Sequence, residues 1–228
     1  MRFVKLCPVM IQVVAIDGIS GSGKSSTARL LARSLGFRHL DTGAMYRMLT
    51  HAALLKGIAS ANHRELGRIA QSLEFSFDKD GGLLADGKTL PIAIRSAEVS
   101  GAVSEYCKSP EVRTVLVAQQ RKLGLQAPCV MEGRDIATVV FPDAPWKFFM
   151  TARPEVRADR RTRELIAAGL PANREEILQN LRERDTKDSS RAVSPLKKAP
   201  DAVELDTSDL TLEAQVAILS DLVRKSPA

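Results

Sequence analysis

Apolar and polar positions alternate along the chain between short apolar runs and stretches with helical spacing, and the order of the two predicts an α/β fold. Short apolar runs bounded by turn residues are expected to be strands, and stretches with helical spacing follow them. The expected strands are residues 13–17, 37–42, 127–132, 146–151 and 202–206. The expected helices include residues 25–35, 44–56 and 212–224, and Gly36 and Gly57 end the first two. This alternation predicts a five-stranded parallel sheet covered by helices on both faces.

One stretch breaks the alternation of strands and helices. Residues 73–77 alternate apolar with polar side chains, and Asp80-Gly81-Gly82 and Asp86-Gly87 are turn signals. We therefore expect short antiparallel strands within residues 73–92, in a small insert that spans residues 60–105. Residues 1–59 and 106–228 would form the core, and the first ten residues are interpreted as an extension that the fold does not need.

The composition is that of a soluble protein with room for one domain and an insert. The chain has 228 residues, of which 44% are hydrophobic and 26% are charged. Its three cysteines are scattered, which favours reduced structural cysteines in the cytoplasm over a disulfide framework or a zinc site. No stretch has the length of a transmembrane helix. Because no apolar surface stripe stands out, we expect a monomer that binds no membrane.

Residues 18–25 fit the phosphate-binding pattern G-x-x-x-x-G-K-[ST], between an expected strand and an expected helix. Glycines let backbone N–H groups point at phosphates, and the helix N-terminus adds partial positive charge. Lys24 is suited to the β- and γ-phosphates of ATP, and the Ser25 hydroxyl to Mg²⁺. The predicted nucleotide-binding residues are Gly18, Ile19, Ser20, Gly21, Ser22, Gly23, Lys24, Ser25 and Ser26.

Three further motifs narrow the class of nucleotide-binding protein. They are D-T-G-A-M-Y-R at residues 41–47, E-G-R-D at residues 132–135 and R-E-R-D-T-K-D-S-S-R at residues 182–191. Together with the phosphate-binding loop, they resemble bacterial cytidylate kinases from about residue 13 to residue 206. The resemblance implies a P-loop kinase of three α/β/α layers with a monophosphate-binding insert and a helical lid. It also implies ATP, Mg²⁺ and CMP or dCMP as ligands.

The resemblance assigns a role to most of the motif residues. It implies that Thr42 and Arg47 hold the acceptor's phosphate and sugar, that Arg184 and Arg191 grip the transferring phosphates, and that Asp188 binds ribose hydroxyls. Asp135, Arg113 and Ser104 would recognise the cytosine base. From the sequence alone, Ser104 could equally well be a serine on the surface of a helix. Arg134 would bind a phosphate or brace its loop. The expected substrate-binding residues are Thr42, Tyr46, Arg47, Ser104, Arg113, Arg134, Asp135, Arg184, Asp188 and Arg191.

Five arginines follow the fourth expected strand, at positions 153, 157, 160, 161 and 163. They are typical of a solvated helix, but the resemblance implies a lid over ATP at about residues 153–172. Either Arg160 or Arg161 would contact ATP, and we take Arg160 as the expected contact. Three positions depart from the family pattern. The family often has Pro at the position of Ile19, Asp at that of Glu132 and a charged residue at that of Ser189. None of these removes a group that binds phosphate.

The expected chemistry is direct in-line phosphoryl transfer without a phosphoenzyme. Lys24, Arg184 and Arg160 would be the catalytic residues, acting by position and charge with Mg²⁺ at Ser25. The acceptor phosphate is already anionic, so no general base is needed. We therefore expect the three histidines, His39, His51 and His63, to be incidental.

Other classes of function explain fewer of these features. The net charge of +6 suits an ordinary basic surface, a nucleotide or a nucleic acid. A nucleic-acid ATPase should interleave basic with aromatic residues, yet only 4% of the chain is aromatic, so we expect no nucleic-acid partner. A GTP-dependent switch would need an N-K-x-D motif, which the sequence lacks. Among kinases, UMP, AMP or a small hydroxylated metabolite stays open as an alternative acceptor.

Overall fold

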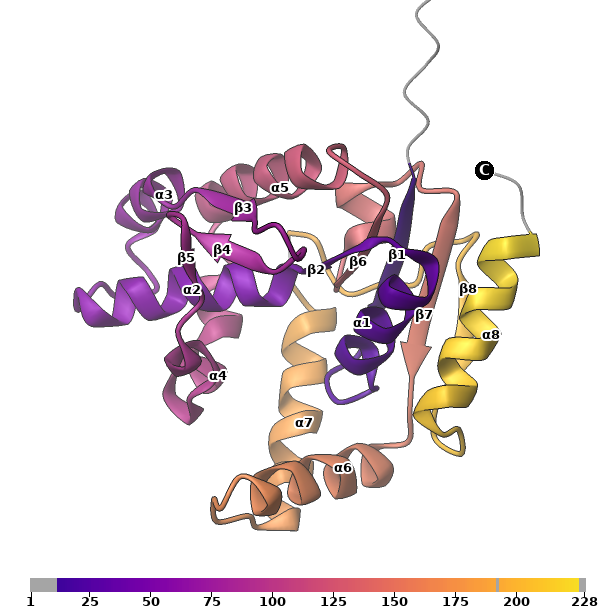
Figure 1. Cartoon of the computed structure of the whole chain (residues 1–228). Coiled ribbons are helices and arrows are strands. Elements are labelled where there is room, and N and C mark those ends of the chain that lie inside the picture. The colour runs from indigo at the N-terminus through magenta and orange to yellow at the C-terminus, as the bar shows by residue number, and fades with distance from the viewer. Residues whose placement is uncertain (1–11, 192, 226–228) are drawn as a thin grey trace, which may run out of the picture.

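Five parallel strands form the central sheet of the computed structural model, which describes residues 12–191 and 193–225 (Figure 1). In spatial order they are β2 (Arg38–Asp41), β6 (Cys129–Gly133), β1 (Val13–Gly18), β7 (Trp146–Thr151) and β8 (Val203–Asp206). Each lies within two residues of the bounds expected from the sequence. The extension predicted for the first ten residues lies outside the described part of the chain.

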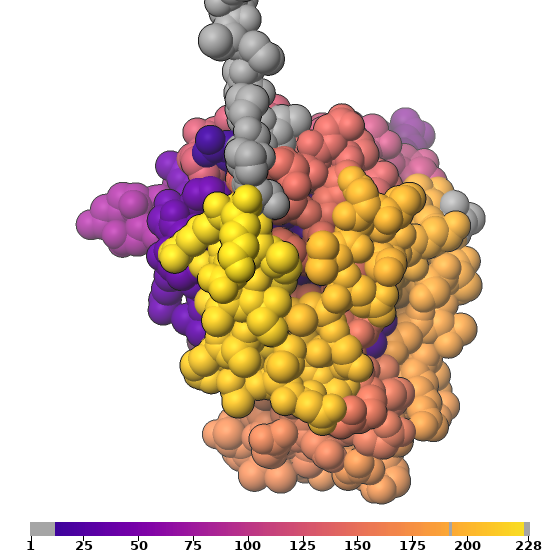
Figure 2. Space-filling view, turned by 90° about the vertical axis from the view of Figure 1, so that its right-hand side faces the viewer, coloured from indigo at the N-terminus to yellow at the C-terminus, as the bar shows by residue number. Residues whose placement is uncertain are grey.

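Helices cover both faces of this sheet and make three layers. One face packs against α1 (Lys24–Leu35) and α8 (Leu212–Lys225), and the other against α2 (Thr42–Leu55) and α5 (Pro110–Gly124). Side chains of β1 alternate between the two, since Val14 and Ile16 pack in one core cluster and Val13 and Ala15 in the other. Figure 2 shows the outer side of α8 in yellow, above the orange residues of the lid region.

The insert contains three short antiparallel strands and the helices that flank them. Its elements are α3 (His63–Ser72), β3 (Phe75–Phe77), β4 (Leu83–Ala85), β5 (Lys88–Thr89), the 3₁₀ helix η1 (Ile92–Arg95) and α4 (Ala97–Tyr106). The turn between β4 and β5 has positive φ at Asp86 and Gly87, as the turn signal predicts. Leu66 and Phe75 belong to the same core cluster as Val13, so the insert and the sheet share one apolar interior. Its status as a separate domain stays a prediction.

Two helices extend below the sheet in Figure 1, and the first of them lies within residues 153–172, where the sequence predicts a lid. They are α6 (Pro154–Ala167) and α7 (Arg174–Ser189), which pack against each other. Gly169 has a positive φ just after α6, within the residues predicted to form the lid. A one-turn π-helix, η2 (Ile136–Val140), follows β6 and was not expected from the sequence. Among the described residues, no helix combines the length and apolar character needed to cross a membrane.

Candidate active site

The phosphate-binding loop connects β1 to α1 at the carboxyl edge of the sheet. Its glycines adopt backbone conformations that side chains rarely reach, with φ of +151° at Gly18, +75° at Gly21 and +91° at Gly23. A Cβ at Gly18 would lie 2.1 Å from the Met150 carbonyl oxygen of β7, so no side chain fits there. Gly23 precedes α1 without a side-chain cap, which leaves the N-terminus of that helix available to an anion.

Lys24 is buried at the first position of α1. Its Nζ donates to the Ile19 carbonyl oxygen at 2.6 Å and lies 3.4 Å from the Ser22 hydroxyl. No carboxylate of the described residues lies within salt-bridge distance of this ammonium. Burial, and next the nearby Arg134, hold the pKa of Lys24 well below its usual value. A phosphate bound in the loop would stabilise the charged form of the Lys24 ammonium, and the ammonium would in turn strengthen binding of the phosphate.

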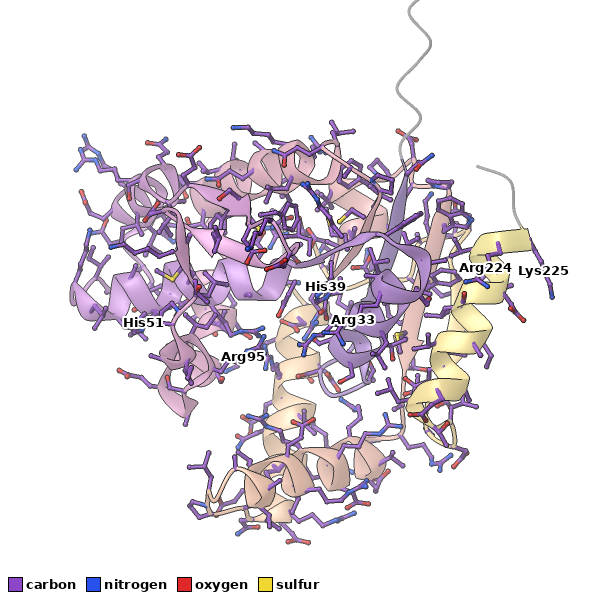
Figure 3. The ribbon with its side chains drawn as sticks, viewed as in Figure 1. Arg33, His39, His51, Arg95, Arg224 and Lys225 are labelled. Atoms are coloured by element: carbon purple, nitrogen blue, oxygen red, sulfur yellow. The ribbon has the colours of Figure 1, made fainter. Side chains whose placement is uncertain are left out.

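Glu132, at the end of β6, connects three parts of the site. Its Oε2 accepts a hydrogen bond from the Ser25 hydroxyl at 2.6 Å, and its Oε1 lies 3.0 Å from His39 Nε2. Its backbone carbonyl accepts from the Thr42 hydroxyl at 2.7 Å. His39 lies near the centre of the molecule in Figure 3, whereas His51 lies out on α2. The expectation that His39 is incidental is therefore wrong, because it holds a carboxylate of the site.

The oxygen atoms of Ser25 and Glu132 fit a magnesium ion. In residues 12–191 and 193–225, no three His, Cys, Asp or Glu side chains form a ready-made metal cluster. Mg²⁺ in phosphoryl-transfer sites needs only one or two protein ligands, because phosphates and waters supply the others. A hydroxyl and a carboxylate 2.6 Å apart beside the loop are hard donors of the right kind.

Residues from the end of the chain support the back of the loop. The Thr207 hydroxyl donates to the Ser22 carbonyl oxygen at 2.8 Å, and the Thr27 hydroxyl of α1 donates to Gln215 Oε1 of α8 at 2.7 Å. All four residues are buried. These bonds hold the loop and the first turn of α1 against the end of β8 and against α8.

Two arginines of α6, Arg157 and Arg160, face the loop. Arg161, the other candidate for contact with ATP, does not. Arg160 donates to the Thr207 carbonyl oxygen at 2.6 Å, beside the loop, while Arg161 is exposed and pairs with Glu164 on its own helix. Arg157 is buried and donates to the Ser20 carbonyl oxygen at 3.1 Å and to Asp185 of α7 at 2.6 Å. Arg160 therefore lies beside the loop and Arg161 does not, while Arg157 ties the loop to α6 and α7.

The acceptor side begins where β2 runs into α2. Asp41 caps α2 by accepting from the Ala44 backbone N–H at 2.9 Å, and Arg47 Nη2 donates to its Oδ2 at 3.2 Å. Arg47 Nε is buried and has no hydrogen-bond partner in the part of the chain that the structure describes. Thr42, the first residue of α2, and Arg47 therefore lie at the same edge of the sheet as the phosphate-binding loop.

A buried ion pair lies where base recognition is expected. Arg113 of α5 donates to Asp135, which follows β6, and its guanidinium stacks 5.4 Å from the centre of the Tyr46 ring. Arg113 Nε and the Tyr46 hydroxyl are buried without partners among the described residues, so donors remain for a ligand. Ser104 is buried in α4, which packs against α2 and α7. It is thus not a helix-surface serine.

Further arginines at this edge come from the segment after β6, from the end of α7 and from the residues that follow α7. Arg134 Nε donates to Asp188 Oδ2 at 2.9 Å, and its Nη1 donates to the Gly133 carbonyl oxygen at 3.3 Å, so Arg134 contacts both Asp188 and its own loop. Burial, and next Arg134, lower the pKa of Arg184 to about 10, and its buried Nε has no partner in residues 12–191 and 193–225. Burial opposes ionisation of Asp188, but Arg134 and Arg191 outweigh it and lower its pKa. The site has more positive than negative charge.

Several site residues were not predicted from the sequence. Asp17 accepts backbone hydrogen bonds from Ile136 and Ala137 at 2.9 and 2.8 Å and so holds the segment after β6 in place. Its position at the end of the first expected strand was a usable signal. The others have roles that depend on contacts between distant segments, which no local pattern reveals. They are His39, Arg95, Arg157, Asp185, Thr207 and Gln215.

A family model and several relatives of known name agree on one family. The family model described as cytidylate kinase matches residues 14–225. A cytidylate kinase of Mycolicibacterium paratuberculosis is 49% identical over 217 residues, which is 93% of this chain and 95% of the relative. Cytidylate kinases of Clostridium tetani and Parabacteroides distasonis are 44% and 43% identical, over 94% of this chain and over 94% and 97% of their own. The similarity thus includes every element of the site.

Proposed function

The chain belongs to the cytidylate kinase family, and from this premise we propose that it transfers the γ-phosphoryl group of ATP directly to CMP or dCMP in a closed site. Membership makes it a kinase with nucleotide substrates. The proposal adds the in-line path, the roles of single residues and the closed state. The cytoplasmic location and the monomeric state remain predictions from the sequence.

The observation that carries the proposal is the surplus of buried or half-buried cations at one edge of the sheet. Lys24, Arg184 and one nitrogen of Arg47 lack a direct anionic partner among the described residues. Their burial lowers the pKa of Lys24 and of Arg184, so both groups are held where charge is costly. A triphosphate donor and a monophosphate acceptor facing each other would neutralise this surplus.

The donor would lie along the phosphate-binding loop. Backbone N–H groups at the start of α1 and the Lys24 ammonium would bind its β- and γ-phosphates, and Arg160 lies beside the loop. Ser25 and Glu132 would hold Mg²⁺, which when bound neutralises charge on those phosphates. Arg157 and Thr207 support the loop from behind through its carbonyl oxygens.

The acceptor would lie between α2, α5 and the end of α7. Asp135 is suited to accept from the exocyclic amine of cytosine, while Arg113 donates to the ring acceptors and Ser104 adds a hydroxyl. Asp188 is suited to the ribose hydroxyls, and Arg47, Arg184 and Arg191 to the phosphate. The acceptor's phosphate oxygen is an anionic nucleophile, so these residues need only align it and screen its charge.

Parallel assays of ADP formation test this function. The wild-type protein receives ATP and Mg²⁺ with CMP, dCMP, UMP, AMP or no acceptor, and Lys24→Met serves as the inactive control. We expect turnover with CMP and dCMP, little with UMP or AMP, and a loss of about a hundredfold or more in kcat for Lys24→Met. Turnover with UMP or AMP alone would refute the base-reading roles. Absence of any acceptor-dependent turnover would refute the proposed function.

A further inference from the structure

We propose that His39 is a positioning residue for Mg²⁺ and acts by holding the Glu132 carboxylate in the orientation that faces Ser25. This inference rests on the proposed function, in which Ser25 and Glu132 would hold the ion. It adds a residue that none of the sequence motifs contains. His39 would touch neither the metal nor the nucleotide, and its whole effect would pass through Glu132.

The alternation of side chains along two neighbouring strands brings His39 and Glu132 together. β2 and β6 run parallel, with His39 opposite Val130. Val130 packs in the apolar cluster that contains α1, and Glu132, two positions further along the strand, shares that face. Leu40 packs in the cluster on the other face, which puts its neighbour His39 on the α1 face as well. Both side chains therefore lie on the side of the sheet where α1 presents Ser25.

The two oxygen atoms of the Glu132 carboxylate have different partners. Oε2 accepts from the Ser25 hydroxyl at 2.6 Å, and Oε1 lies 3.0 Å from His39 Nε2. Because an ionised carboxylate only accepts hydrogen bonds, Nε2 carries the proton of this contact. The side chain of Glu132 is 4% exposed and that of His39 is 18% exposed, so little water competes for the contact. The imidazole thus occupies Oε1 and leaves Oε2 turned towards Ser25.

A glutamate needs such a second contact because its carboxylate ends a chain of three rotatable bonds. Each bond has several accessible orientations, and only some combinations direct an oxygen at the Ser25 hydroxyl. His39 belongs to a strand of the central sheet, so its hydrogen bond selects one orientation before a metal ion arrives. Hydrogen bonds that orient a metal ligand in this way typically contribute about tenfold to a hundredfold to metal affinity.

A positioning role and a purely structural role of His39 predict different effects. If the side chain only stabilises the junction of β2 and β6, its loss should weaken binding of ATP equally with and without Mg²⁺. If it orients Glu132 for the metal, its loss should weaken only the part of the binding that depends on Mg²⁺. A substitute that keeps an N–H donor at the same reach should then preserve the effect.

The experiment compares ATP binding in Mg²⁺ with ATP binding in EDTA. Isothermal titration gives the factor by which Mg²⁺ lowers the Kd for ATP, and by linkage this factor equals the gain in Mg²⁺ affinity that ATP acquires on the protein. We expect His39→Leu to reduce the factor by about tenfold to a hundredfold, with Kd in EDTA unchanged. His39→Gln should keep most of it, because its amide N–H can replace Nε2. His51→Leu, which removes a histidine that lies out on α2, is the matched control and should change nothing.

A double-mutant cycle tests whether His39 acts through the Glu132 carboxylate. Glu132→Gln removes the charge that the metal would bind, so it should reduce the Mg²⁺ factor by itself. Adding His39→Leu to Glu132→Gln should then cause no further reduction, because the two residues act as one unit. A further reduction in the double variant would contradict action through Glu132.

Two outcomes with the single variants would overturn the role of His39. Equal losses in Mg²⁺ and in EDTA would make it a structural residue, and an unchanged factor in His39→Leu would make its contact with Glu132 incidental. Thermal melting confirms that each variant is folded, and His39→Phe, which keeps a ring without a donor, replaces His39→Leu if that variant does not fold. If Mg²⁺ does not strengthen ATP binding to wild type, the metal site of the proposed function fails and this inference fails with it. A normal factor in wild type that survives in His39→Leu fails only this inference.

Discussion

At the scale of single residues, the ion pair between Arg113 and Asp135 combines stability with selectivity. Both side chains are buried, and each compensates the other's charge. Removal of one partner leaves the other buried and unpaired, which costs several times more than loss of an exposed pair. Loss of either partner alone is therefore expected to destabilise the fold, and only the outer donors and acceptors of the pair are left to contact a base.

Asp135→Asn tests the base-reading role of this pair. The amide keeps the shape but loses the charge, and its NH₂ group can face the O4 of uracil, so the ratio of kcat/KM for CMP to that for UMP should fall about tenfold or more. Steady-state kinetics with both acceptors measure the ratio. A melting curve separates this effect from instability, because a folded variant with an unchanged ratio would contradict the role of Asp135.

Residues that act through a local motif could be predicted, and residues that act through packing could not. Lys24, Ser25, Arg47 and Asp135 all lie in recognisable patterns, and the structure places them at one edge of the sheet. Glu132 was noted only as a departure from a family pattern. Its contact with His39 requires β2 and β6 to be neighbours, and the sequence does not give the order of strands in the sheet.

At the scale of elements, β1 and η2 meet at a buried carboxylate with an unusual titration. Burial, reduced by the backbone hydrogen bonds from Ala137 and Ile136, raises the pKa of Asp17 from 3.8 to about 6. The folded protein therefore binds a proton that the unfolded chain has already lost between about pH 4 and pH 6. This contribution to stability is fully present below about pH 4 and is lost as the pH rises through about 6.

Comparison with Asp17→Asn measures this contribution, since the other titrating groups largely cancel. The free energy of unfolding of wild type minus that of the variant should decrease by about 3 kcal/mol between pH 4 and pH 7.5, from about two pKa units. Urea unfolding across this range gives the difference. A difference that stays constant with pH would show that Asp17 ionises in the folded protein as it does in the unfolded chain.

The elements themselves were predictable to different degrees. The strands of the sheet and the antiparallel insert were expected because their apolar periodicity and turn residues are strong local signals. The π-helix η2 was not, because its backbone is stabilised by hydrogen bonds to Asp17, more than a hundred residues away in sequence. Elements that depend on such distant partners carry little information in their own residues.

At the scale of the whole molecule, Arg157 connects three parts of the protein. It donates to the carbonyl oxygens of Ala152 and Ser20 and to the Asp185 carboxylate, so α6, the phosphate-binding loop and α7 meet at one side chain. Gly21 lacks a side chain at this point, and a Cβ there would lie 3.2 Å from the Arg157 Cβ. The lid therefore has a fixed base at the loop.

Arg157→Met is expected to loosen this base. Loss of the buried guanidinium should lower the free energy of unfolding by about 2 to 4 kcal/mol and raise the KM for ATP more than that for CMP. Denaturant unfolding and steady-state kinetics measure the two effects. Arg161→Met, on the exposed side of α6, is the control and should stay within about 0.5 kcal/mol of wild type. Equal changes in both KM values would contradict a role on the donor side.

The support of the phosphate-binding loop by Thr207 and Gln215 has a consequence for biosynthesis. The hydrogen bonds to Ser22 and Thr27 span 185 and 188 residues of sequence. A ribosome therefore adds the partners that fix the loop's shape long after it has made the loop itself. A nascent chain carries the complete nucleotide motif before it has a finished nucleotide site.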